Sequence, residues 1–112
     1  MSNLDILQKI YDYELIQYEY LKKYPKGEKF ALVTEIKNTT YSLSKKLLKA
    51  SMVEKKKAVL YEADIELWHL KHLIRLSHEM KFMSNKAYAV SSEKLTEIGK
   101  MLGAWIKTVK SN

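Results

Sequence analysis

The stretch from Leu60 to Phe82, LYEADIELWHLKHLIRLSHEMKF, decides the fold of this chain. Apolar or small side chains recur in it every three or four residues, in a heptad-like pattern. The positions that follow this pattern are Leu60, Ala63, Leu67, Leu70, Ile74 and Ser77. The spacing predicts an amphipathic helix that buries one stripe, so other helices must cover it.

Three further segments have helical periodicity, and short connections separate them. Residues 4–24 form the first, which ends at Tyr24-Pro25-Lys26-Gly27, where proline and glycine favour a chain reversal. Residues 28–50 form the second, although Asn38-Thr39-Thr40 predicts a bend or a lower local stability in its middle. A connection over Ser51 to Lys57 leads to the central helix. Ser84 or Asn85 can cap the last helix.

Each of these helices has a predicted buried face. The first has a wide one, made of a stripe at Leu4, Leu7, Tyr11, Leu15, Tyr18 and Leu21 and a second stripe at Ile6, Ile10, Tyr13, Tyr20 and Tyr24. The second helix directs Phe30, Val33, Ile36, Leu43, Leu47 and Ala50 inward. The last helix directs Leu95, Ile98, Leu102, Trp105, Ile106 and Val109 inward. Gly99 and Gly103, one turn apart, and Trp105 are predicted to serve helix packing.

Composition agrees with an all-α domain over residues 1–112, folded as an antiparallel up-down-up-down four-helix bundle. Hydrophobic residues make up 46% of the 112 residues, which suffices for one core, while 3 Gly and 1 Pro are too few for a many-stranded sheet. We find no apolar run of about 18 residues and no leader pattern, so we expect a soluble, cytoplasmic protein. The absence of Cys excludes disulfides and thiolate chemistry.

The positive charge is concentrated in one third of the chain. The net charge is +7, and residues 25–57 hold nine lysines against three acids. Two interpretations are equally open: compact ammonium groups that bind phosphates without reading bases, or a solvated face that maintains solubility. The candidate nucleic-acid-binding lysines are Lys26, Lys29, Lys45, Lys46, Lys49, Lys55, Lys56 and Lys57.

A second basic feature lies on the central helix. Lys71 and Arg75 are spaced i and i+4, so their charges lie one above the other on a face away from the buried stripe. Such a pair can hold neighbouring phosphates, although Glu79 can instead pair with Arg75. Most aromatic residues fit buried stripes; Trp68, Tyr41 and Tyr88 do not and are candidates for a protein–protein surface, as in a homo-oligomer.

Catalysis has little support in the sequence. His69, His72 and His78 are the residues from which a catalytic or metal site would have to start, and Glu66 with His69 supplies half of one di-metal ligand set. Glycine-rich phosphate loops and zinc or calcium motifs are missing. We therefore expect no enzymatic activity, no metal and no cofactor.

Several stretches of the sequence are similar to one known family. Residues 61–64 (YEAD), Leu70-Lys71, Ile74-Arg75-Leu76 and above all residues 97–106 (EIGKMLGAWI) resemble the accessory variability determinant (Avd) proteins of diversity-generating retroelements. That wider group includes four-helix bundles encoded in intervening sequences of bacterial 23S ribosomal RNA genes. The turn Tyr24-Pro25-Lys26 also matches, so the resemblance covers nearly the whole chain.

The resemblance implies a homopentameric basic barrel that binds RNA, DNA or their hybrid with little sequence preference. It also implies a non-catalytic role beside the element's reverse transcriptase in mutagenic retrohoming. Two basic residues of the family's third helix, implicated in nucleic-acid and polymerase binding, fall on Lys71 and Arg75. Five chains at +7 would carry about +35, a field that attracts nucleic acid. The alternative is a bundle of the ribosomal-RNA intervening-sequence type with a structural or protein-interaction role.

Overall fold

The computed structural model describes the backbone of residues 3–110 and the side chains of residues 5–109. Four α-helices follow one another, α1 (Asn3–Leu21), α2 (Leu32–Met52), α3 (Lys57–Glu79) and α4 (Asn85–Lys110), with a short 3₁₀ helix, η1 (Lys26–Glu28), between the first two. The predicted all-α class is confirmed, as are the chain reversal after Tyr24 and the connection that precedes the central helix.

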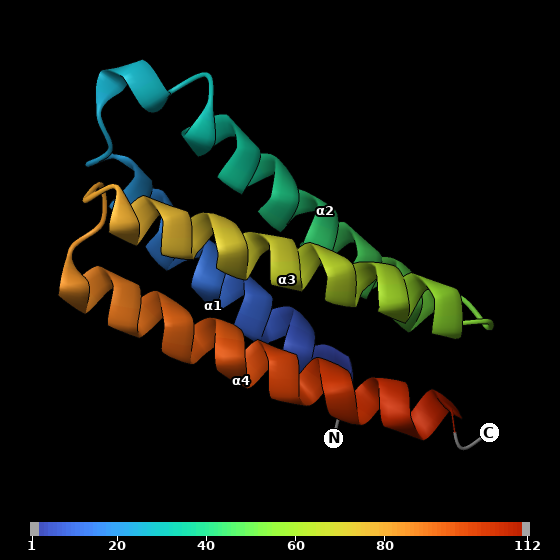
Figure 1. The fold of residues 1–112 in the computed structure, drawn as a ribbon. Coiled ribbons are helices and arrows are strands. Elements are labelled where there is room, and N and C mark those ends of the chain that lie inside the picture. The colour runs from blue at the N-terminus through green and yellow to red at the C-terminus, as the bar shows by residue number, and fades with distance from the viewer. Residues whose placement is uncertain (1–2, 111–112) are drawn as a thin grey trace.

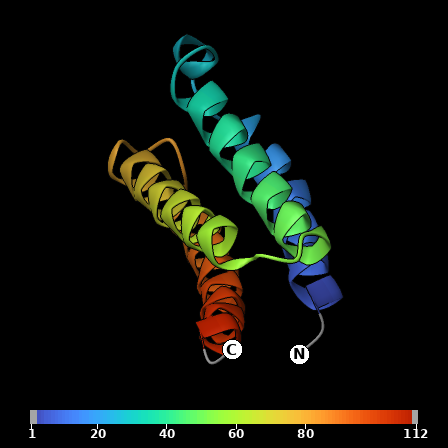
Figure 2. The same ribbon diagram turned by 90° about the vertical axis from the view of Figure 1, so that its right-hand side faces the viewer.

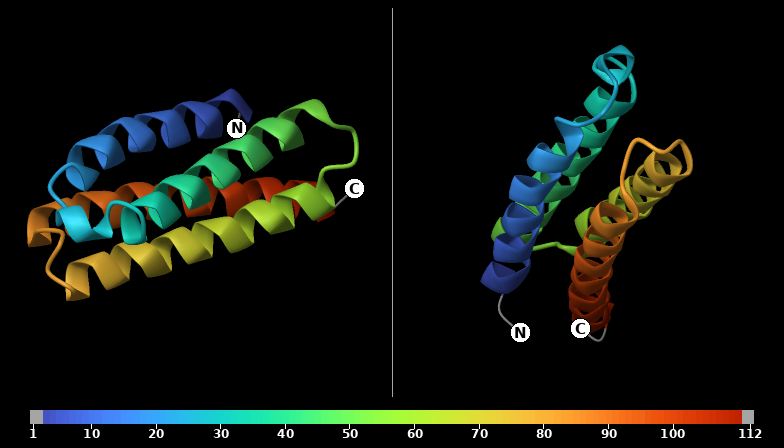
Figure 3. Two further views of the ribbon diagram at one scale, coloured as in Figure 1. Left: turned by 90° about the horizontal axis from the view of Figure 1, so that it is seen from above. Right: turned by 90° about the vertical axis from the view of Figure 1, so that its left-hand side faces the viewer.

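The helices form a ring of antiparallel neighbours in which α1 contacts α2 and α4, and α3 contacts α2 and α4 (Figure 1). Across residues 3–110, the backbones of the diagonal pairs, α1 with α3 and α2 with α4, do not approach each other closely. The molecule measures 46 × 24 × 20 Å. Viewed along the bundle, the α1–α2 pair and the α3–α4 pair lie side by side as two layers (Figures 2 and 3).

Local hydrogen bonds explain where α3 ends and α4 begins. Lys81 adopts a left-handed backbone conformation with φ 65°, and the Phe82 amide donates to the carbonyl of Ser77, as in a Schellman motif. The Ser84 hydroxyl then accepts a hydrogen bond from the Ala87 amide at 3.1 Å. Ser84 is therefore the N-cap of α4, one of the two predicted candidates.

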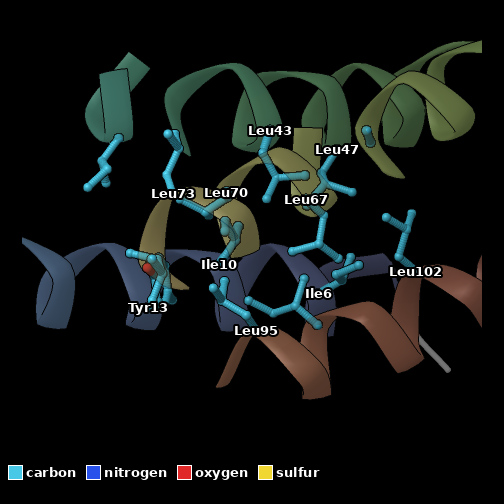
Figure 4. Packing of buried hydrophobic residues seen from close by; sticks show 14 of the residues in the cluster. Ile6, Ile10, Tyr13, Leu43, Leu47, Leu67, Leu70, Leu73, Leu95 and Leu102 are labelled. Atoms are coloured by element: carbon cyan, nitrogen blue, oxygen red, sulfur yellow. The ribbon is translucent and has the colours of Figure 1, made fainter. Parts of the chain in front are cut away.

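The core lies between the four helices, and α3 contributes most to it (Figure 4). All six predicted positions of the α3 stripe are buried, Ser77 included, whose hydroxyl donates to the Leu73 carbonyl at 2.8 Å. Leu95, Ile98 and Leu102 of α4 are buried as predicted, while Trp105, Ile106 and Val109 pack partly buried against the same core. Helix α2 continues through Asn38-Thr39-Thr40 without a break, and Thr40 Oγ1 donates to the Ile36 carbonyl.

Two predictions about buried faces are wrong. On α1 the second stripe enters the core, with Ile6, Ile10 and Tyr13 buried, whereas Tyr11 and Leu15 of the first stripe are exposed. The buried Gln17 fixes this orientation, because its side-chain amide and the Thr40 hydroxyl of α2 are hydrogen-bonded at 3.0 Å. Other first-stripe members differ: Leu21 is buried, Tyr18 is exposed, and the side chain of Leu4 lies outside the described residues.

Phe30 is the second error, because it is 87% exposed in the turn between η1 and α2. Helix α2 begins at Leu32 rather than Glu28, since Pro25 starts η1 and the chain turns again before α2. Phe30 therefore precedes the helix whose buried face it was predicted to join. Its ring instead lies beside the Lys29 ammonium, 5.5 Å from the ring centroid.

Tyr13 is fully buried, and within the described part of the chain its hydroxyl has no hydrogen-bond partner. We expect Tyr13→Phe to raise the free energy of unfolding at pH 7 by about 1 kcal/mol, because it removes an unpaired buried polar group. The melting temperature should rise by roughly 4 °C. Thermal denaturation followed by circular dichroism measures this, and Tyr11→Phe, at an exposed position, is the matched control.

The same substitution should alter the pH dependence of stability. Burial raises the pKa of Tyr13 far above its ordinary value of 10.0. The unfolded chain therefore releases this proton near pH 10 while the folded chain keeps it, so folding stability is retained below pH 10 and falls as the pH rises above it. Tyr13→Phe should lose less stability between pH 9 and 11. An equal loss in both proteins would contradict this assignment.

Candidate nucleic-acid interface

Lys71 and Arg75 both line a groove between α3 and α4, with a volume of about 360 Å³. Trp68, His72 and Ile74 complete the α3 side, and the α4 side consists of Tyr88, Ser92, Leu95 and Thr96. Ile74 and Leu95 are buried and form an apolar floor. The two cations thus stand beside an open, partly aromatic groove.

Lys71 is held in place by two neighbours. Its ammonium lies 4.8 Å from the centroid of the Trp68 ring, a cation–π contact. It also crosses Gly99 of α4, where an added Cβ would lie 3.3 Å from Lys71 Nζ and 3.5 Å from Leu67 Cδ2. The lack of a side chain at Gly99 therefore gives Lys71 room to lie over α4.

Arg75 has no carboxylate partner among residues 5–109. The ion pairs in that range join Lys9 to Glu97, Lys22 to Glu19 and His69 to Glu35. Glu79, the alternative partner of Arg75, lies with it along a shallow groove but does not form an ion pair. An exposed guanidinium without a partner is available to an external anion.

The predicted lysines do not form one patch within a single chain. Lys26 and Lys29 lie in and after η1, whereas Lys55, Lys56 and Lys57 lie at the α2–α3 connection, at the opposite end of the bundle (Figure 1). Lys45, Lys46 and Lys49 lie along α2 between these ends. Two of these ammonium groups donate hydrogen bonds within the described structure. Lys56 donates to the carbonyls of Ala50 and Val53, and Lys46 donates to Ser42 Oγ.

A second basic groove lies where α1, η1 and α2 meet, and the sequence singled out two of its lysines, Lys26 and Lys29, but not the groove itself. Its basic lining residues are Lys22, Lys26, Lys29 and Lys37. Lys37 Nζ lies 4.9 Å from the centroid of the Tyr18 ring, and the Tyr18 hydroxyl contacts that of Tyr41. The i, i+4 spacing does not reveal this groove, because it depends on how η1 folds back.

The residues predicted for helix packing differ in their surroundings. Gly99 admits a close neighbour, as described above, and Trp105 packs partly buried against the core. Gly103 is exposed, and an added Cβ there would have no heavy atom within 4 Å. Among the residues that the structure describes, therefore, no other helix packs against Gly103.

The histidines form contacts that are unrelated to a metal centre. His69 Nε2 lies 3.2 Å from Glu35 of α2, and the His78 ring stacks on Tyr88 with centroids 4.2 Å apart. Nowhere in the described part of the chain do three His, Asp or Glu side chains gather closely enough to hold a metal ion.

Two exposed apolar faces lie outside the core. One spans α1 and α2 and consists of Tyr11, Leu15, Tyr18, Tyr41 and Leu48. The other is a stripe on α3 at Tyr61, Ile65 and Trp68, which are spaced by four and then three residues. Between residues 3 and 110 no helix is long and apolar enough to cross a membrane. Faces of this size on a small bundle are typical of surfaces that other chains cover.

Comparison with known proteins identifies the family. No curated protein matches the sequence significantly. The family described as bAvd-like matches residues 4–109, which includes all four helices. A match over nearly the whole length agrees with the four antiparallel helices and with the basic surface described above. The chain therefore belongs to the bAvd-like family, the bacterial Avd proteins, which are non-catalytic accessory proteins of diversity-generating retroelements.

Proposed function

We propose that this protein is a nucleic-acid-binding accessory subunit of a retroelement reverse transcriptase. It holds template, primer or product beside the polymerase during mutagenic retrohoming and takes no part in the chemistry. The observation that carries the proposal is the Lys71 and Arg75 pair, placed one turn apart at an open groove, with Arg75 free of any carboxylate partner in the described structure. The family match favours this function over the ribosomal-RNA intervening-sequence alternative.

The charge distribution supports phosphate contacts without sequence readout. Lysine ammonium groups are point charges that attract phosphates, and the lysine-rich residues 25–57 reach from η1 at one end of the bundle to the α2–α3 connection at the other. Assembly would bring several such surfaces together, and the exposed apolar face on α1 and α2 supports a homo-oligomer, with a pentamer as the proposed form. Specificity for a template would then come from the polymerase or from the shape of the RNA.

Fluorescence anisotropy at several salt concentrations tests nucleic-acid binding. We expect the purified protein to bind labelled single-stranded RNA, DNA and an RNA–DNA hybrid, with log K falling linearly with log salt concentration. Each phosphate neutralised contributes about 0.7 to the slope for a single strand. A lack of binding to all three at about 20 mM salt would refute the proposal. Co-purification with a reverse transcriptase of a diversity-generating retroelement, expressed together with this protein, tests the polymerase association separately.

A further inference from the structure

The groove between α3 and α4 has the components of a site for an unpaired base. Its volume of about 360 Å³ falls within the range of small-ligand sites, about 300–1,000 Å³. Ile74 and Leu95 form its apolar floor, and aromatic side chains stand on both helices, Trp68 on α3 and Tyr88 on α4. A flat aromatic ligand can therefore lie between the two helices.

Trp68 is the exposed stacking surface of this groove. It is 64% exposed although it is the largest side chain at the site, and burial in the core does not account for it. Lys71 lies over the ring and restrains it, which lowers the entropy lost when a ligand stacks on the indole. Tyr88 is restrained in the same way, because its ring is stacked on His78. Both rings are thus positioned before a ligand arrives.

The polar groups of the groove complement a base and its flanking phosphates. The hydroxyls of Ser92 and Thr96 line the groove, and neither has a hydrogen-bond partner in the described structure, so both are available to the edge of a base. Lys71 and Arg75 provide positive charge on the α3 side. Bases within a duplex are stacked and inaccessible, so the groove fits a base that is already unpaired.

We infer that this groove binds an unpaired base of a single-stranded nucleic acid, stacked on Trp68, with the adjoining phosphates on Lys71 and Arg75. The inference rests on the proposed function and makes it specific: phosphates supply affinity for any nucleic acid, and the groove adds a preference for single strands. Base-on-aromatic stacking is tolerant of sequence, so no base identity is implied.

Binding of one single strand and one duplex of matched length, measured at the same salt concentration, tests this inference. We expect Trp68→Ala to weaken single-strand binding roughly 5- to 150-fold, from the known range of base–aromatic stacking. Duplex binding should change less than about twofold, and the salt slope should stay the same, because stacking releases no counterions. Trp68→Phe should restore most of the single-strand affinity. Met80→Ala, at an exposed apolar residue that lies outside both apolar faces and both basic grooves, is the control.

The possible outcomes separate this inference from the proposed function. If the wild-type protein binds single strands and Trp68→Ala binds them equally well, the base site is wrong while nucleic-acid binding stands. If Trp68→Ala weakens single strand and duplex alike, or changes the oligomer measured by light scattering, Trp68 serves assembly and the inference is overturned. If the wild-type protein binds no nucleic acid at low salt, the proposed function fails and this inference fails with it.

Discussion

Replacing Lys71 and Arg75 together by alanine should weaken nucleic-acid binding about 25- to 60-fold at 0.1 M salt while leaving the fold intact. Each cation–phosphate contact contributes about 0.7–0.9 to the slope of log K against log salt concentration. At about 0.1 M salt this is equivalent to roughly 5- to 8-fold in affinity. Both side chains lie at the rim of the α3–α4 groove, outside the core, so their loss should not unfold the bundle. Anisotropy titrations across a salt series measure both quantities, and the slope should fall by about 1.4–1.8.

A charge-matched control distinguishes a local site from the general field of the protein. Lys9 forms a 3.0 Å ion pair with Glu97, and Lys94 of α4 lines neither of the two basic grooves. Replacing these two lysines by alanine removes the same net charge from surfaces outside both grooves, and we expect less than a threefold change in affinity. Equal losses in the two double variants would show that affinity follows net charge and that Lys71 and Arg75 form no site.

The buried stripes of α2, α3 and α4 were predictable because, in each of these helices, most of the apolar side chains lie along a single side. Leu60, Leu67 and Leu70 can share a face in only one helical register, and all three are buried. Helix α1 has two apolar stripes, so periodicity alone does not decide between them. The decision depends on Gln17, which is buried because Thr40 of α2 supplies its hydrogen bond. A contact between helices therefore settles what the spacing within α1 leaves open.

The candidate site likewise combines features that the spacing within one helix predicts with features that depend on contacts between helices. The i, i+4 spacing of Lys71 and Arg75 predicted their common face without knowledge of the fold. The α4 side of the groove was not predictable, because it depends on the register of α4 against α3, which brings Gly99 under Lys71. Tyr88 was singled out only as an aromatic residue off the main stripes, and Ser92 and Thr96 carry no sequence signal for a binding groove. The two carbonyl contacts of Lys56 likewise appear only when the α2–α3 connection is folded.

Leu47 and Leu48 are adjacent leucines on α2 with opposite environments, and alanine substitutions at the two positions should differ greatly. Leu47 is 0% exposed and lies in the core (Figure 4), whereas Leu48 is 50% exposed. Leu47→Ala should lower the free energy of unfolding by about 2–5 kcal/mol, through lost burial and the cavity left behind. The melting temperature should fall by roughly 10–20 °C. Chemical and thermal denaturation measure both quantities.

Leu48→Ala is the matched control for Leu47→Ala. It is the same substitution at the next residue of the same helix, so the two variants differ mainly in how deeply the replaced leucine is buried. We expect it to lower the free energy of unfolding by less than about 1 kcal/mol, since a half-exposed leucine loses little apolar contact within one chain. Leu48 belongs to the exposed α1–α2 face, so a loss of oligomer without a loss of helix would assign that face to assembly. If both variants were equally destabilised as monomers, the register of α2 in the bundle would be wrong, and with it the position of α2 against α3.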